Sequence, residues 1–143
     1  MYSLAACWLN KSERRRVNGF QNRCLRTIWG IKPAYISRVS NASVLQTTGE
    51  RPLTCALQRH QLLLFGRVAR KPDGHPMRDV TFCPGTLHPA TDRYVRKIGR
   101  PRLDWAGGVL KLALEAAGSL ALLEQAVQDD FAWRSIVEAY VHR

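Results

Sequence analysis

The sequence predicts a mainly α fold: an irregular bundle of about five to six helices with a Pro/Gly-rich loop or small hairpin inserted around residues 74–98. Apolar residues recur every three or four positions through most of the chain, which is the period of an amphipathic helix. Ser, Pro and Gly residues stand where these stretches begin and end, as they do at capped or broken helices. With 143 residues, 45% of them hydrophobic, the chain can bury one core and has about the size of one domain.

The first amphipathic helix is expected from Ser12, which serves as its N-cap, to about Gly30. One narrow arc of its helical wheel is apolar and is predicted to face the core: Val17, Phe20, Cys24, Ile28 and Ile31. The opposite arc is polar and is predicted to face solvent: Arg15, Asn22, Arg23 and Arg26. One face of this helix is therefore expected to pack and the other to carry positive charge.

Two more helices are predicted before residue 74. Ser40 is expected to cap a short helix over residues 41–48 that Gly49 closes. A long helix is expected from Pro52, at its first position, to about Arg70. Apolar residues cover most of the long helix, so it is predicted to be the central buried one.

The long helix leaves one stripe without apolar side chains. It consists of Arg59, Gly66 and Arg70, at positions i, i+7 and i+11. Because glycine has no side chain between the two guanidinium groups, a nucleic-acid phosphate is expected to approach the backbone closely there.

Residues 74–98 are rich in turn formers and contain two β-favouring runs, 79–83 and 94–98, which are compatible with a small hairpin. Three helices are expected after this insertion: one over about residues 103–117, one from Ser119 and one from about Asp129.

The helices and the insertion divide the chain into three predicted segments. A basic helical segment spans residues 1–73, a linker spans 74–98, and a C-terminal helical segment spans 99–143.

Positive charge is concentrated in the first part of the chain. The net charge is +11, and residues 1–102 hold 19 basic and 5 acidic side chains, whereas residues 103–143 hold 3 and 6. Arginine outnumbers lysine, and its planar guanidinium binds phosphate through two parallel hydrogen bonds. The predicted partner is therefore RNA or DNA, bound mainly through its backbone.

The predicted nucleic-acid-binding residues come from three basic clusters: Arg15, Arg23, Arg26, Arg59, Arg70, Lys71, Arg96, Arg100 and Arg102. Trp29 and Tyr35 are expected to be partly exposed, whereas Trp105 and Trp133 fall on core faces.

Patterns that would indicate an enzyme have simpler interpretations. Asp129 and Asp130 resemble the paired aspartates of a polymerase metal site, but the helical period that follows favours N-capping. His60 lies on an apolar face, which favours a hydrogen-bonded core histidine. Gly107 and Gly108 favour a close helix contact over a nucleotide-binding loop. We therefore expect no catalytic residues, no metal and no cofactor.

The cysteines and histidines do not have the spacing of a zinc site. The candidate ligands are Cys55, His60, His75, Cys83 and His88, and no Cys-x2-Cys pair is present. We expect reduced cysteines. No apolar run is long enough to span a membrane, and residues 1–10 have no basic stretch before their short apolar stretch, which a signal peptide would have. We therefore expect an intracellular protein, nuclear or cytoplasmic, without a membrane partner.

Several short motifs resemble, in the same order, the region that follows the polymerase core in non-LTR (LINE-type) retrotransposon reverse transcriptases. Residues 20–31 resemble its F-x-x-R-C-L-R-x-I-x-G-I stretch, and residues 49–53 its G-x-x-P-L. Residues 59–71 resemble its R-R-L-R-W-x-G-H-V-x-R segment, with Arg67 where the family usually has His. Residues 99–105 match G-R-P-R-x-x-W, and 130–134 resemble D-R-x-x-W-R.

The resemblance implies a detached C-terminal part of such a protein, comprising the end of the thumb and the helical region after it, which in the family grips template RNA and target DNA. The catalytic palm has no counterpart in the sequence. Three hypotheses follow: a non-catalytic nucleic-acid binder with weak sequence preference, a structural subdomain that docks on a reverse transcriptase core through residues 103–141, or a pseudogene product without function.

Overall fold

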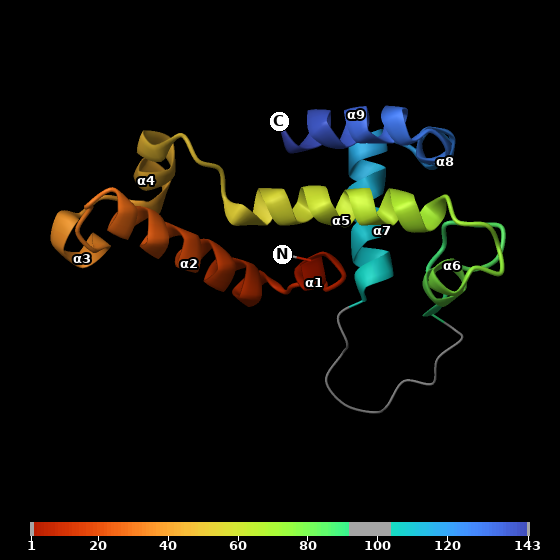
Figure 1. The fold of residues 1–143 in the computed structure, drawn as a ribbon, viewed down its shortest axis with the longest axis horizontal. Helices are drawn as coiled ribbons and strands as arrows, with labels where there is room; N and C mark the ends of the chain where they lie inside the picture. Colours follow the sequence, from red (N-terminus) through yellow and green to blue (C-terminus); the bar gives the residue numbers. More distant parts are fainter. Residues whose placement is uncertain (1, 92–103, 143) are drawn as a thin grey trace, which may run out of the picture. The chain divides into compact units, whose positions relative to one another are not determined.

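The computed structural model describes residues 2–91 and 104–142 and is mainly helical (Figure 1). The described helices are α1 (Tyr2–Ala5), α2 (Lys11–Ile28), α3 (Ala34–Ser37), α4 (Asn41–Thr48), α5 (Leu53–Ala69), α6 (Pro76–Thr81), α7 (Trp105–Ala117), α8 (Leu120–Gln128) and α9 (Asp130–Val141). The predicted mainly α fold is confirmed. The helices outnumber the five or six expected because α1, α3 and α6 are short turns that leave little periodic signal.

Residues 74–91 form a helix and a loop in place of the first half of the predicted hairpin. His75 caps α6 and Pro76 occupies its first position, so the run 79–83 begins as helix. Within the described residues, only an isolated antiparallel bridge between Phe82 and Pro89 has β geometry. The second β-favouring run, 94–98, lies outside the described residues.

The chain forms two compact units. We call residues Leu9–Leu57 the basic unit, and residues Met1–Trp8 together with Gln58–Arg143 the core unit. The boundary at residue 57 falls inside α5, whereas the sequence placed its first boundary at residue 73. Local pattern alone could not locate this boundary, because α5 is one uninterrupted helix that contributes side chains to both units.

The core unit is held by a contiguous apolar core. In Figure 1, α7 crosses α5 and carries α8 and α9 at one end, and buried residues of all four helices pack in one cluster. The cluster includes Phe65, whose ring centroid lies 5.4 Å from that of Phe82 and 6.0 Å from that of Trp133. Trp133 of α9, which the sequence places on a core face, is fully buried, and so are Val137 of α9 and Val109 of α7.

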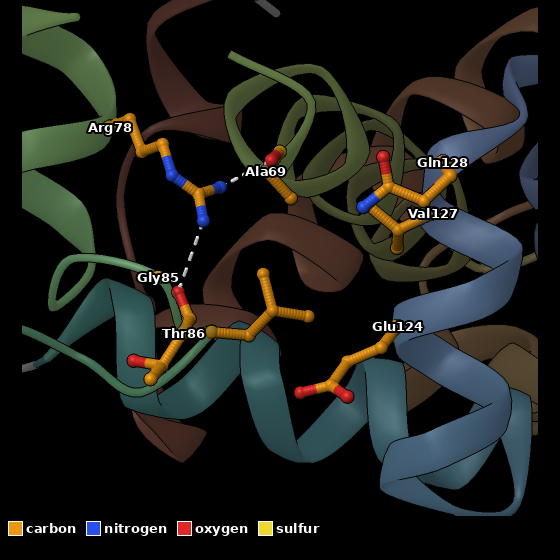
Figure 2. Close-up of a pocket in the computed structure, with 8 residues that line it drawn as sticks. Ala69, Arg78, Gly85, Thr86, Glu124, Val127 and Gln128 are labelled. Atoms are coloured by element: carbon orange, nitrogen blue, oxygen red, sulfur yellow. Dashed lines mark hydrogen bonds between the residues drawn. The ribbon is translucent and has the colours of Figure 1, made fainter. Parts of the chain in front are cut away.

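Arg78 fixes the loop that follows α5 in the core unit. Its guanidinium donates to the carbonyl oxygens of Ala69 and Thr86 (Figure 2). It also donates to the Asp73 carboxylate, at 2.8 Å. The hydrogen bond from Arg78 is the main reason why the pKa of Asp73 lies below its ordinary value. Figure 2 shows Glu124 of α8 lining the small hollow beside this anchor.

The basic unit contains α2, α3, α4 and the first turn of α5, and α2 packs on α4. Its buried residues are few, namely Asn22, Arg26, Val44 and Leu57. The predicted inward face of α2 is wrong: Phe20 is 59% and Ile28 is 76% exposed, whereas Asn22 and Arg26 are 4% and 7% exposed. Half of the predicted polar arc, Asn22 and Arg26, therefore faces the interior of this unit, whereas Arg15 and Arg23 are exposed.

The inward polar arc is explained by the backbone groups that α2 must satisfy. The first N–H groups of a helix have no partner within the helix. Those of Leu53 and Thr54, at the start of α5, donate to the side-chain oxygens of Gln21 (2.6 Å) and Asn18 (3.1 Å). The Gln21 amide also donates to the Arg51 carbonyl at 2.7 Å. Amide side chains of α2 thus cap α5, which apolar ones could not do.

Helix ends follow the predicted capping chemistry in most places. Ser40 caps α4, and Gly49 ends it with a left-handed φ of 70°, as expected. The N-cap of α2 is Asn10, which forms a capping box with Glu13, so α2 starts ahead of the predicted Ser12 cap.

Among the described residues, no single helix is long and apolar enough to cross a membrane. Helices α7 and α8 reach that length and composition only as a pair, and they meet at 93°. Their apolar faces include Val109, Leu112 and Leu123, which are buried in the core unit.

Candidate nucleic-acid interface

Exposed cations are concentrated on α2 of the basic unit. This unit has nine basic and two acidic side chains, a net charge of +7 within residues 9–57. Lys11, Arg15, Arg16 and Arg23 are exposed, and among the described residues none of them has an ion-pair partner. The positive charge of α2 is therefore free to act on an external anion.

One exposed stripe of α2 combines positive charge with an aromatic ring. Arg16, Phe20, Arg23 and Thr27 follow one another at i, i+4, i+7 and i+11, so they share one side of the helix, and all four are exposed. The Phe20 ring thus lies between two guanidinium groups, each about one turn away. Cations alternating with aromatic side chains are typical of surfaces that bind single-stranded nucleic acid.

Arg26 does not belong to this exposed surface, contrary to the prediction. Its two terminal nitrogens donate to four oxygens: Lys32 O (3.0 Å), Ser37 Oγ (3.5 Å), Val39 O (2.7 Å) and Asn41 Oδ1 (3.2 Å). These bonds satisfy carbonyl groups of the loop between α2 and α4. Arg26 is therefore a structural residue of the basic unit, and the sequence pattern could not reveal this because its partners lie outside the helix.

Exposed aromatic side chains continue beyond the end of α2. Trp29 is 56% exposed and Tyr35, on α3, is 79% exposed, which confirms the expected exposure of both. Either ring presents a face on which a nucleic-acid base could stack.

The predicted stripe on α5 has a different role. The side of α5 that carries Gly66 is covered by α9: a Cβ atom at Gly66 would clash with the indole ring of Trp133. The indole nitrogen of Trp133 donates to the carbonyl of Leu62 at 2.9 Å. The missing side chain at Gly66 thus admits a tryptophan of the same unit, and the predicted approach of a phosphate there is wrong.

The two arginines that flank Gly66 hold α9 in place. Arg59 donates to Glu138, with an Nε–Oε1 distance of 2.7 Å, and Arg70 donates to Asp130 and to the Val127 carbonyl. The hydrogen bond between Arg59 and Glu138 is the main reason why the pKa of Glu138 is lowered and that of Arg59 is raised. Arg59 and Arg70, predicted to bind phosphate, are thus engaged within the core unit.

The remaining predicted binding residues divide into two groups. Lys71 is exposed and, among the described residues, has no ion-pair partner. Arg96, Arg100 and Arg102 lie outside the described residues.

The alternative chemical sites have structural explanations. Asp129 caps α9 by accepting from the N–H of Phe131, which confirms the capping interpretation, and Asp130 pairs with Arg70 and Arg134. His60 is exposed, so the predicted core histidine is wrong. A close contact does occur at Gly108, where a Cβ atom would meet the Trp8 ring, but Trp8 lies in the segment between α1 and α2 and not in a helix as expected.

No group of three or more His, Cys, Asp or Glu side chains in residues 2–91 and 104–142 is placed to hold a metal ion. The four cysteines of the chain are unpaired.

Three residues of the α2 stripe, Arg16, Phe20 and Thr27, were not among the predicted binding residues. Arg16 lies in the first basic cluster beside Arg15, and Phe20 was expected in the core because apolar residues usually face inward. The signal that could have identified both is the recurrence of Arg, Phe and Arg at helical spacing.

Comparison of the chain with protein-family models, with curated proteins and with solved structures finds no match.

Proposed function

We propose that the chain binds the backbone of RNA or DNA through the exposed cations of α2, with weak sequence preference and without catalysis. The observation that carries the proposal is the set of exposed cations Lys11, Arg15, Arg16 and Arg23, which have no ion-pair partner in the described part of the chain, in a unit of net charge +7. The motif order that resembles non-LTR retrotransposon reverse transcriptases supports the same function, with the chain as the C-terminal part of such a protein.

The physical basis is counterion release. A nucleic acid condenses cations along its phosphates, and each bound arginine releases about one of them. Only two acidic side chains lie in the basic unit, and one of them, Glu13, accepts from the N–H of Asn10 in the capping box. Little internal negative charge therefore competes with phosphate for the α2 arginines.

The test is the salt dependence of binding to a fluorescent single strand, measured by anisotropy. Replacing Arg15, Arg16 and Arg23 together by Gln removes three exposed cations from α2. The log–log slope of affinity against salt is expected to fall by about 2, and affinity at low salt by at least about tenfold.

The matched control removes three exposed cations from the core unit instead, by replacing Arg67, Lys111 and Arg134 with Gln. Its net charge equals that of the α2 triple variant, so only the position of the charge differs. The control is expected to leave the slope nearly unchanged. Equal loss in both variants, or binding by the unaltered chain that does not depend on salt, would contradict the proposal.

A second candidate function is docking on a reverse transcriptase core. The apolar faces of α7, α8 and α9 are largely occupied within the core unit, but Leu122 and Phe131 remain 55% and 79% exposed. If docking is the function, a supplied polymerase domain should protect the amides around Phe131 from hydrogen exchange. The same experiment should then leave the α2 amides unaffected.

A further inference from the structure

The basic unit contains a hollow beside the α2 stripe. Its volume is about 410 Å³, within the range of roughly 300–1,000 Å³ that ligand pockets occupy. The hollow lies among α2, the loop after it and the start of α4, and its lining consists of Gly19, Asn22, Arg23, Arg26, Thr27, Ile31, Pro33, Ala34 and Asn41.

One buried polar atom of the lining lacks a partner. Asn22 is only 4% exposed, and its amide nitrogen donates to the Asn18 carbonyl at 2.8 Å. Its side-chain oxygen is buried and has no hydrogen-bond partner among the described residues. The neighbouring Arg26 does not supply the donor, because its terminal nitrogens donate to loop and α4 oxygens. An unpaired buried acceptor is costly, so a donor from outside the chain would be favourable there.

The rest of the lining indicates the chemistry of that donor. Ile31, Pro33 and Ala34 supply apolar surface, and Arg23 supplies an exposed cation without an ion-pair partner among the described residues. A suitable ligand is therefore a planar ring with an N–H donor, joined to a negatively charged group. A nucleobase with its phosphate has this combination, and proteins bind unstacked bases by apolar contact and edge hydrogen bonds.

We infer that the hollow receives one unstacked base of a bound single strand, with Asn22 Oδ1 as its acceptor and Arg23 on the adjoining phosphate. This inference rests on the proposed function and adds to it a site for a base beside the backbone contacts. A paired duplex cannot fill the hollow without extruding a base, so single strands are expected to bind more tightly than duplexes of equal length.

Gly19 offers a way to close the hollow without removing charge. It lines the hollow within α2, and a Cβ atom placed on it meets no other atom within 4 Å. Gly19→Leu should therefore fill the hollow, and Gly19→Ala is the matched control, because both replace glycine by a better helix former and only leucine is large.

The experiment uses the full chain and a short single strand with a 2-aminopurine in place of one base, prepared as RNA and as DNA. Unstacking of this base raises its fluorescence. The unaltered chain and Gly19→Ala are expected to raise the fluorescence, and the larger rise decides between RNA and DNA. Gly19→Leu is expected to lose the rise and about fivefold to tenfold in affinity, with an unchanged salt slope because no cation is removed.

The outcomes separate the two proposals. If Gly19→Leu retains both the fluorescence rise and the affinity, the inference is overturned while backbone binding stands. If no strand binds the unaltered chain at low salt, the proposed function is wrong, and titration with nucleoside monophosphates then tests the hollow alone. A shift of the Asn22 side-chain amide signals in NMR spectra would support the inference, and no shift would overturn it.

Discussion

The two units use arginine in opposite ways. In the core unit, Arg59 and Arg70 bind carboxylates of the same unit, whereas Arg15, Arg16 and Arg23 of the basic unit lie exposed without acidic partners among the described residues. The difference follows the local supply of acidic residues, which is nine against thirteen basic residues in the core unit and two against nine in the basic unit. Where carboxylates are near, arginine supports the fold, and where they are scarce it can serve a partner.

The interiors of the two units also differ: that of the core unit is apolar, and that of the basic unit is partly polar. The core unit buries aromatic and aliphatic side chains such as Phe65 and Trp133, so its stability comes mainly from removing apolar surface from water. The basic unit buries Asn22 and Arg26 beside Val44 and Leu57, and hydrogen bonds to loop carbonyls and helix ends join its parts. The basic unit is therefore expected to open more readily.

The largest expected effect comes from removing a tryptophan of the core unit. Trp133→Ala should lower the free energy of unfolding of this unit by about 3 to 5 kcal/mol, because it leaves a cavity and breaks the bond to the Leu62 carbonyl. Trp29→Ala should change the free energy of unfolding of the basic unit by less than about 0.5 kcal/mol, because the Trp29 ring is exposed. Hydrogen exchange resolved by peptide measures the free energy of unfolding of each unit. Equal losses in the two variants would contradict the difference between the two interiors.

The next effect separates stability from binding within α2. Arg26→Gln should destabilise the basic unit by about 3 kcal/mol, because the buried guanidinium and its hydrogen bonds to several oxygens are lost. Arg23→Gln should leave stability within about 0.5 kcal/mol and should weaken binding of a single strand instead. Exchange protection of α2 amides and binding anisotropy are the two measurements. A stable Arg26→Gln variant with weakened binding would restore Arg26 to the binding surface.

The smallest effect concerns pH and the core unit. Arg59 lowers the pKa of Glu138 in the folded state, so this ion pair stabilises the fold above the unfolded-state pKa and loses its contribution as the pH falls through the folded-state value. Both side chains are about 40% exposed, so water screens the pair and limits its contribution to less than about 1 kcal/mol.

Glu138→Gln should therefore lower the unfolding midpoint slightly at neutral pH, and this difference should shrink as the pH falls through the folded-state pKa of Glu138. Thermal unfolding followed by circular dichroism at several pH values is the measurement. An undiminished difference at low pH would show that packing, and not the charge, is what Glu138 contributes.

What the sequence determined by itself is largely what local forces decide. Ser40 caps the start of α4, Gly49 ends it, and Asp129 caps α9. These ends were predictable because a cap is a bond between residues close together in the chain. The inward faces of α7 and α9 were also predictable, since long runs of apolar residues at helical spacing leave only one face to bury.

Tertiary structure decided which face of α2 turns inward and what the α5 stripe contacts. Both faces of α2 could pack, and the polar face does so because the start of α5 and the following loop need hydrogen-bond partners that Phe20 could not supply. The local sequence around Gly66 and its flanking arginines is equally compatible with contact to a phosphate and with contact to another helix. What the α5 stripe contacts depended on Trp133, which is distant in the sequence. The folded chain, and not the local pattern, brings Trp133 to that surface.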